Sequence, residues 1–268
     1  MDLQLRGKRA LVTGSSSGIG EGIAKVLAQE GVVVAVHGRD EERANRVAHE
    51  ITANGGKAFI AIGDLATDEG ASQVTHKALS SLGGVDILVN SAGLIGHYET
   101  WMDTSTNQWA EMYNTNVIAA VRLVKLLMPQ MKELGWGRMI NIASAQGTQP
   151  FGMMPDYAAT KSAVLNLTVS VAKELSRTGI TVNAVSPGII VTSKLEHNLR
   201  QMAASKGWGS DWAEIEKHVL QTELDNPTGH LGDIDDVANL VAYLSSPLAK
   251  YINGANIRVE GGSIVTIN

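Results

Sequence analysis

A serine, a tyrosine and a lysine in the middle of the chain have the chemistry and spacing of a proton-transfer device. Tyr157 and Lys161 are four residues apart in a helical pattern that starts near Pro155, so their side chains are expected one turn apart on the same face. Ser144 follows an apolar run, residues 138–143, that predicts a buried strand, and the next loop can bring its hydroxyl toward that face. A free phenol has a pKa of about 10, and a nearby ammonium favours its phenolate form. The three groups could therefore exchange a proton with a bound substrate.

A Tyr-x-x-x-Lys pair by itself is also typical of an ordinary helix with a solvated lysine, so its meaning depends on the whole chain. The 268 residues, 44% hydrophobic and 18% charged, predict one globular domain over residues 1–268. The net charge of −5 offers no basic surface to nucleic acid. No apolar run approaches the roughly 20 residues that cross a bilayer, and the first residues lack the apolar core of a secretory signal. We expect a cytoplasmic protein that binds neither nucleic acid nor membrane.

The chain contains no cysteine, which excludes disulfides, thiolate chemistry and cysteine-based metal sites. Its seven histidines are scattered, without a His-x-x-x-His pair. We therefore predict no metal site.

A glycine-rich turn near the N-terminus has the arrangement of a phosphate-binding site. The apolar run Lys8–Thr13 predicts a strand, Gly14-Ser-Ser-Ser-Gly18-Ile-Gly20 follows it, and a helical pattern continues from there. Glycines let the backbone approach a diphosphate, and a helix N-terminus presents free N–H groups and a partial positive charge. The spacing departs from the commoner Gly-x-Gly-x-x-Gly, but strand, turn and helix in this order predict a nucleotide site.

The end of the second predicted strand, Val32–His37, bears on the choice of cofactor. The residues that follow are Gly38-Arg39-Asp40. Arg39 can pair with a 2′-phosphate and stack on adenine, which favours NADP over NAD. Asp40 can cap the next helix while Arg39 is solvated, or Asp40 can bind the ribose of NAD. Ser17 precedes the second glycine of the turn, so a cationic pocket depends on Arg39 alone.

Strands and helices alternate along the rest of the chain. Helices are predicted at 41–53, 67–82, 155–177 and 234–244, and strands at 58–62, 85–90, 138–143, 180–185 and 256–260. This alternation predicts an α/β fold: a single-domain, doubly wound parallel sheet (a Rossmann fold) with helices on both faces. Asp64 and Asn90 follow strands, at the edge where such sheets bind ligands; Asp64 could hold the adenine or serve only as a turn residue.

Two segments are harder to interpret. A long helix predicted from about Gln108 to Met131 carries Asn116, and an asparagine inside a helix indicates either solvent exposure or a local distortion with a purpose. Residues 189–230 mix tryptophans, leucines, charges and glycines. They predict one or two helices that either cover a site as a lid or form an ordinary helix pair with a satellite core.

Several of these motifs together resemble the short-chain dehydrogenase/reductase family, with 3-oxoacyl-carrier-protein reductase-like members the closest in appearance. They are Thr13–Gly20, Asn90-Ser-Ala-Gly93, Asn116, Ser144, Tyr157-Ala-Ala-Thr-Lys161 and Ser186-Pro-Gly188. The motifs occur in the family's order, Ser144 stands 13 positions before Tyr157, and the likeness extends to Val259-Glu-Gly-Gly262. One departure is Ser91, where the family usually has a second asparagine.

The resemblance implies an NADPH-dependent carbonyl reductase that interconverts a ketone and a secondary alcohol by hydride transfer. Its catalytic tetrad would be Asn116, Ser144, Tyr157 and Lys161. Tyr157 would act as the general acid and base, and Ser144 would polarise the carbonyl. Lys161 would bind the nicotinamide ribose and lower the Tyr157 pKa, and Asn116 would hold a water that links Lys161 to solvent. A homotetramer built through the helices at about 108–131 and 157–177 and through the C-terminal strand is also implied.

The resemblance extends to the cofactor and substrate contacts. The implied cofactor-binding residues are Gly14, Ser16, Ser17, Gly18, Ile19, Gly20, Arg39, Asp64, Leu65, Asn90, Ala92, Gly93, Tyr157, Lys161, Pro187, Gly188, Ile190 and Thr192. The substrate pocket is expected to include Leu94, His97, Gln146, Gln149, Phe151, Met153, Met154, Leu195 and Trp208. Because this set is mostly apolar, with a few amides and no convergent Arg/Lys pair, it favours a ketone on an apolar or carrier-bound skeleton.

Two other functions compete with this one. An NAD-dependent secondary-alcohol dehydrogenase would use the same fold and the same catalytic residues. A nucleotide-sensing protein could keep the fold without turnover, because a fold alone does not prove a function; the intact Ser144, Tyr157 and Lys161 set argues against that alternative.

Overall fold

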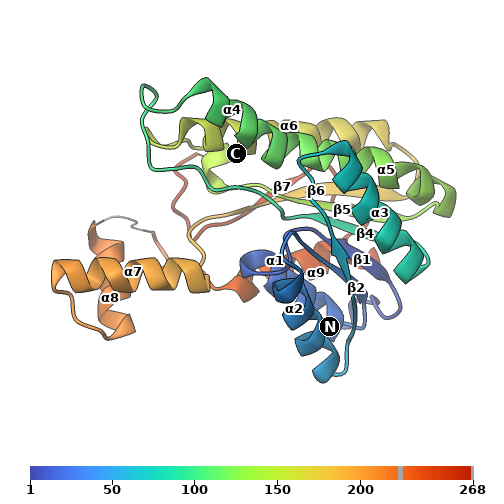
Figure 1. The fold of residues 1–268 in the computed structure, drawn as a ribbon, viewed down its shortest axis with the longest axis horizontal. Helices are drawn as coiled ribbons and strands as arrows, with labels where there is room; N and C mark the ends of the chain where they lie inside the picture. The colour runs from blue at the N-terminus through green and yellow to red at the C-terminus, as the bar shows by residue number, and fades with distance from the viewer. Residues whose placement is uncertain (223–225, 267–268) are drawn as a thin grey trace.

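Parallel strands form one sheet at the centre of the computed structural model, which describes residues 1–222 and 226–266. Within these residues the sheet has seven strands in the order β3-β2-β1-β4-β5-β6-β7, which confirms the predicted doubly wound fold (Figure 1). The strands are β1 (Arg9–Val12), β2 (Val33–Gly38), β3 (Lys57–Ile62), β4 (Ile87–Asn90), β5 (Gly137–Ile142), β6 (Ile180–Pro187) and β7 (Asn256–Val259). All neighbouring pairs run parallel.

Helices cover both faces of the sheet. One face is packed by α1 (Gly18–Gln29), α2 (Glu41–Ala53) and α9 (Ile234–Ser245), and the other by α3 (Asp68–Leu82), α5 (Ala119–Leu134) and α6 (Pro155–Glu174). Each face has its own apolar core, because the central strands are buried on both sides. Gly22 allows the close packing of α1 on α9, since a Cβ there would lie 2.0 Å from Cγ2 of Ile234.

The carboxyl ends of the strands all meet at one edge of the sheet. The chain runs outward from β1 to β2 and β3 on one side, and from β4 to β7 on the other, so the order reverses between β1 and β4. Ligands of doubly wound proteins bind at such a reversal. The glycine-rich turn follows β1, and Ser144 follows β5, so both lie at this edge.

The predicted long helix at 108–131 is interrupted. It consists of α4 (Thr106–Tyr113), a π-helical turn η1 (Asn114–Ile118) and α5. Single π-turns inside α-helices are rare and are frequent at functional sites. Asn116 lies in this turn and is buried, so the structure favours a local distortion over a solvated asparagine.

The segment 189–230 forms a helix pair, α7 (Ser193–Lys206) and α8 (Trp212–Thr222), that extends away from the sheet in Figure 1. The pair has a satellite core of its own, which includes Leu199, Ile215 and Val219. Residues 223–225 of this segment lie outside the described residues. The lid role therefore stays a prediction. No helix in the described part of the chain has both the length and the apolar character needed to cross a membrane.

Candidate active site

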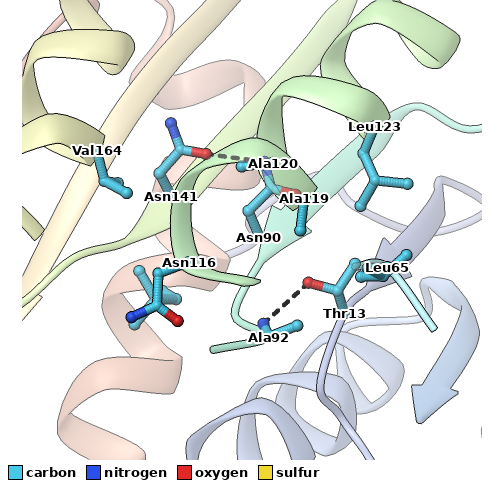
Figure 2. Close-up of a pocket in the computed structure, with 11 residues that line it drawn as sticks. Thr13, Leu65, Asn90, Ala92, Asn116, Ala119, Ala120, Leu123, Asn141 and Val164 are labelled. Atoms are coloured by element: carbon cyan, nitrogen blue, oxygen red, sulfur yellow. Dashed lines mark hydrogen bonds between the residues drawn. The ribbon is translucent and has the colours of Figure 1, made fainter. Parts of the chain in front are cut away.

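The glycine-rich turn between β1 and α1 is pressed against the loop that follows β4. Gly14 has a φ of +65°, and a Cβ on it would lie 2.8 Å from Cα of Ala92. Thr13 holds the two segments together, because its Oγ1 accepts hydrogen bonds from the backbone N–H groups of Ser91 and Ala92, each at 3.0 Å (Figure 2). A side chain at position 14 would separate these segments.

The imidazole of His37 holds the turn in place from the side of β2 and β3. The sequence placed His37 only in a predicted strand. Its Nδ1 accepts a hydrogen bond from the N–H of Gly14 at 3.0 Å, and its Nε2 lies 3.1 Å from the carbonyl oxygen of Gly63. The ring is therefore neutral with its proton on Nε2. Burial lowers the pKa of His37 to about 4. The sequence signal that could have indicated this role is a histidine at the end of a predicted strand in a protein with a glycine-rich turn.

The turn fits a dinucleotide. Ser17 is the N-cap of α1, and its side chain makes no capping hydrogen bond. The first N–H groups of α1 consequently have no side-chain acceptor here, and a diphosphate is the kind of anion that such a helix start binds. Gly18 has a φ of +60°, and the nearest atom to a Cβ there is Cγ2 of Thr192, at 3.7 Å. This contact places Thr192, which was predicted to contact the cofactor, beside the turn.

Of the polar residues that follow β2 and β3, Asp40 and Asp64 bond to nearby backbone groups and Arg39 does not. The carboxylate of Asp40 caps α2 by accepting from the N–H of Arg43 at 3.1 Å, and it also pairs with the Arg43 guanidinium. Within the described residues Arg39 is exposed and no hydrogen bond or ion pair engages its guanidinium. Asp64 is also exposed, and its carboxylate accepts from the N–H of Ala66. The structure therefore gives Asp40 and Asp64 local backbone roles and leaves Arg39 open to a ligand.

Ser144, Tyr157 and Lys161 converge where β5 meets α6. Ser144 is buried just after β5, and its side chain interacts with the Tyr157 hydroxyl, which by itself lowers the pKa of the phenol. Lys161 is also buried; its Nζ lies 5.5 Å from the centroid of the Tyr157 ring and donates to the carbonyl oxygen of Ile142 at 2.9 Å. The two hydroxyls and the ammonium predicted from spacing are thus neighbours.

The pKa of Tyr157 differs from the sequence-based expectation that Lys161 lowers it. The pKa of Tyr157 is raised, because burial penalises the phenolate more than the hydrogen bond with Ser144 favours it. The expectation that Lys161 lowers this pKa is wrong for this structure. Burial lowers the pKa of Lys161 itself to about 8, and its Nζ is directed to a carbonyl oxygen on β5. Burial of both groups could not be seen in a four-residue spacing.

Asn116 connects the loop after β4 with α6. Its Oδ1 accepts from the N–H of Leu94 at 2.7 Å, and its Nδ2 donates to the carbonyl oxygen of Leu94 at 3.0 Å and to Oγ1 of Thr160 at 3.1 Å. Thr160 in turn donates to the carbonyl oxygen of Tyr157. Thr160 was missed by sequence analysis, although it lies within the Tyr-x-x-x-Lys motif. The π-turn thus carries the side chain that links the loop to the start of α6.

A small cavity of about 10 Å³ lies beneath the π-turn, lined by Asn90, Asn116 and Asn141 among others (Figure 2). Asn90 donates to Oδ1 of Asn141 at 2.8 Å, and its own Oδ1 is buried without a partner. The cavity is about large enough for one water molecule and too small for a substrate. The cavity is therefore part of the structure that supports the site and is not a binding pocket for substrate.

The other predicted site residues fall into two groups. The remaining cofactor residues lie at the carboxyl edge of the sheet, at the end of β6, at the start of α1 or in the loops that follow the strands: Ser16, Ile19, Gly20, Leu65, Gly93, Pro187, Gly188 and Ile190. Among the predicted pocket residues, Leu195 and Trp208 pack in the α7–α8 core, where Trp208 stacks on His218. Gln149 is bound by the C-terminal segment, since its Oε1 accepts from the N–H of Val265. His97 and Phe151 are exposed, and Met154 is buried.

Comparison with known proteins gives consistent findings. The family model described as "short chain dehydrogenase" matches residues 8–204. The chain is 37% identical to the 3-oxoacyl-[acyl-carrier-protein] reductase FabG of Staphylococcus aureus (strain N315), over 95% of this chain and 97% of that protein. A solved structure of L-sorbose reductase from Gluconobacter frateurii, complexed with NADPH and L-sorbose, superposes with a TM-score of 0.93 at 34% identity and covers 100% of both chains. A 7α-hydroxysteroid dehydrogenase complexed with NADH and 7-oxo glycochenodeoxycholic acid superposes with a TM-score of 0.86 at 33% identity, over 100% of this chain and 98% of that one.

Proposed function

This chain belongs to the short-chain dehydrogenase family of NAD(P)-dependent oxidoreductases, and we propose that it is an NADPH-dependent carbonyl reductase. The proposed reaction interconverts a ketone and a secondary alcohol by hydride transfer, with Tyr157 as general acid and base. The observation that carries the proposal is the convergence of the Ser144 and Tyr157 side chains beside the buried Lys161. This pair lies at the same edge of the sheet as the glycine turn.

The residues of the chain have separate tasks in this proposal. When bound, the nicotinamide cofactor supplies the hydride. The Ser144 hydroxyl donates a hydrogen bond to the carbonyl oxygen of the ketone and stabilises the charge that develops there. Tyr157 donates its proton to the same oxygen; a phenol is protonated at neutral pH, and the raised pKa of Tyr157 keeps it so. Asn116 keeps the loop at Leu94 and the start of α6 in register.

The preference for NADP is supported by the arrangement after β2. Arg39 is exposed and unengaged in the described part of the chain, whereas the Asp40 carboxylate is committed to α2. An arginine with free donors suits a 2′-phosphate, and a carboxylate that is already bonded is a poor ligand for a ribose hydroxyl. The complex of L-sorbose reductase with NADPH is consistent with this choice.

An NAD-dependent alcohol dehydrogenase is the second candidate, because the similar 7α-hydroxysteroid dehydrogenase is complexed with NADH. The ligands of the similar proteins range from a sugar ketone to a 7-oxo steroid. The proposal therefore covers ketones in general and names no particular class of ketone. A lid role for α7 and α8 also belongs to the proposal.

We further propose a homotetramer formed through α5 and α6. Leu126 on α5 and Val169 on α6 are large apolar side chains that are 40% and 39% exposed, and a second copy would cover them. The predicted cytoplasmic location stays a prediction.

The test is a screen of ketones and secondary alcohols with NADPH, NADH, NADP and NAD, followed by absorbance of the reduced nicotinamide. The proposal expects ketone-dependent oxidation of NADPH with a higher kcat/KM than for NADH. Purified protein that binds NADPH but turns over none of the substrates would support the nucleotide-sensing alternative. A higher kcat/KM with NADH would support the second candidate.

A further inference from the structure

The side-chain amide of Gln146, two residues after Ser144, carries an unused hydrogen-bond acceptor. Its Oε1 is buried and has no hydrogen-bond partner. Gln146 is the second residue after Ser144, in the short helical turn η2 (Ala145–Gly147), and its backbone N–H donates to Oγ of Ser144 at 3.2 Å. A buried amide oxygen without a partner is destabilising, so such atoms call for an explanation.

The surroundings of the amide show which end is open. Nε2 lies 4.0 Å from Sδ of Met154. Because a thioether accepts hydrogen bonds and cannot donate them, the amide nitrogen is the end that faces the sulfur. A contact of this length holds the amide only weakly. Oε1 is closed off from solvent in this state, but no strong bond prevents the amide from turning toward a donor in the site.

The other polar side chains of this loop are already used. Oε1 of Gln149 accepts from the N–H of Val265, and Oγ1 of Thr148 accepts from Nδ2 of Asn256 at 3.4 Å. In the part of the chain that the structure describes, five buried side chains carry an unpartnered polar atom, and of these only Gln146 belongs to the loop between Ser144 and Tyr157. Among the side chains of this loop, the unpartnered acceptor is therefore specific to Gln146.

We propose that Gln146 is a specificity-determining residue that accepts a hydrogen bond from a hydroxyl group on the carbon next to the substrate carbonyl. This inference rests on the proposed reduction of ketones, and it narrows the substrate class to α-hydroxy ketones. The backbone N–H of Gln146 is bonded to Ser144 Oγ, so in this proposal a carbonyl held by Ser144 and Tyr157 brings the neighbouring carbon of the ketone toward residue 146. The amide is uncharged, so it suits a neutral hydroxyl and offers nothing to balance a charged group.

The test compares two ketones that differ only at this group: hydroxyacetone and 2-butanone, in which a methyl replaces the hydroxyl. The wild-type protein is expected to have a kcat/KM about 10- to 100-fold higher for hydroxyacetone. Gln146→Met, which keeps the length of the side chain and removes the amide, is expected to abolish most of this ratio. It should do so by lowering kcat/KM for hydroxyacetone while that for 2-butanone and the KM for NADPH stay near wild type.

Two further variants complete the design. Gln146→Glu keeps an oxygen acceptor and is expected to preserve the preference for hydroxyacetone. Gln73→Met makes the same change at an exposed position of α3 and is expected to preserve it as well. A wild-type ratio near one, or a ratio that survives in Gln146→Met, would overturn the inference. If neither ketone is reduced while another ketone of the screen is, the inference fails alone; if no ketone of the screen is reduced with NADPH or NADH, the proposed function fails, so the two failures are distinguishable.

Discussion

The ammonium nitrogen of Lys161 lies 5.5 Å from the centroid of the Tyr157 ring and is buried against the carbonyl oxygen of Ile142. Burial lowers the pKa of Lys161 to about 8, below its ordinary value of 10.5. Between these two values the unfolded chain binds more protons, so this group makes stability rise with pH there and imposes its full cost below about pH 8. Lys161 is therefore retained at a cost in stability, as expected of a functional group.

Replacing Lys161 by methionine should separate function from stability. At pH 7 the change removes the cost of burying the charge, up to about 3 kcal/mol, and loses one hydrogen bond. We expect turnover to fall by at least about 100-fold while the thermal unfolding midpoint does not fall. Lys173→Met, on the exposed side of the same helix, is the control and should change neither quantity. An active Lys161→Met protein with a lowered midpoint would contradict this account.

Replacing Arg39 by aspartate should reverse the cofactor preference without affecting the fold. Arg39 has no hydrogen bond or ion pair to lose in the described residues, and aspartate would repel a 2′-phosphate. We expect the ratio of kcat/KM for NADPH over NADH to fall by about 10- to 100-fold.

Arg43→Gln is the matched control for Arg39→Asp, since Arg43 lies on the next turn and is paired with Asp40. It should leave the ratio of the two cofactors near wild type. A preference for NADPH that survives Arg39→Asp would show that another part of the site selects the cofactor.

His37 should make the protein less stable in acid. Its pKa is lowered on folding from 6.5 to about 4, so between these values the unfolded chain binds the additional proton and stability falls as the pH falls. Asp64 and Arg39 are the charged groups that act on the ring, with opposite signs. Between pH 7.5 and pH 5, wild type should lose about 2 kcal/mol more than His37→Asn in urea unfolding. Equal losses in the two proteins would contradict the assignment of a neutral, buried imidazole.

Asn116 should matter for positioning rather than for proton transfer alone. Asn116→Leu keeps the size of the side chain but leaves the N–H and carbonyl groups of Leu94 without their partner. We expect a loss of about 1–3 kcal/mol in the free energy of unfolding and an increase in KM for the ketone. The neighbouring Asn114→Leu is the comparison variant, because its amide bonds to Ala66 and Arg122 instead; it should leave KM for the ketone near wild type. A ketone KM that stays at the wild-type value in Asn116→Leu would contradict the positioning role.

Much of the fold could be predicted because its signals are local. The helix Glu41–Ala53 has the predicted bounds, since Asp40 provides a recognisable cap and Asn54 and the glycines after it end the pattern. The strands β5 and β6 could be predicted because each is an apolar run, which is also a local signal. The π-turn has no such pattern, and only the unfavourable position of Asn116 inside a helix indicated it.

The site was less predictable, because burial and pairing are tertiary properties. The spacing of Tyr157 and Lys161 predicted their proximity but wrongly predicted a lowered phenol pKa, since the cost of burial is invisible in the sequence. The role of His37 depends on Gly14 and Gly63, which are distant in the chain. The unpaired oxygen of Gln146 depends equally on what surrounds it.

Turnover of Tyr157→Phe, measured together with its affinity for NADPH, tests the central claim most directly. The change removes only the phenolic hydroxyl that interacts with Ser144. The account predicts that kcat for ketone reduction falls by about 100- to 10,000-fold while the Kd for NADPH stays close to that of wild type. A Tyr157→Phe protein that keeps most of its kcat would show that Tyr157 is not the proton donor.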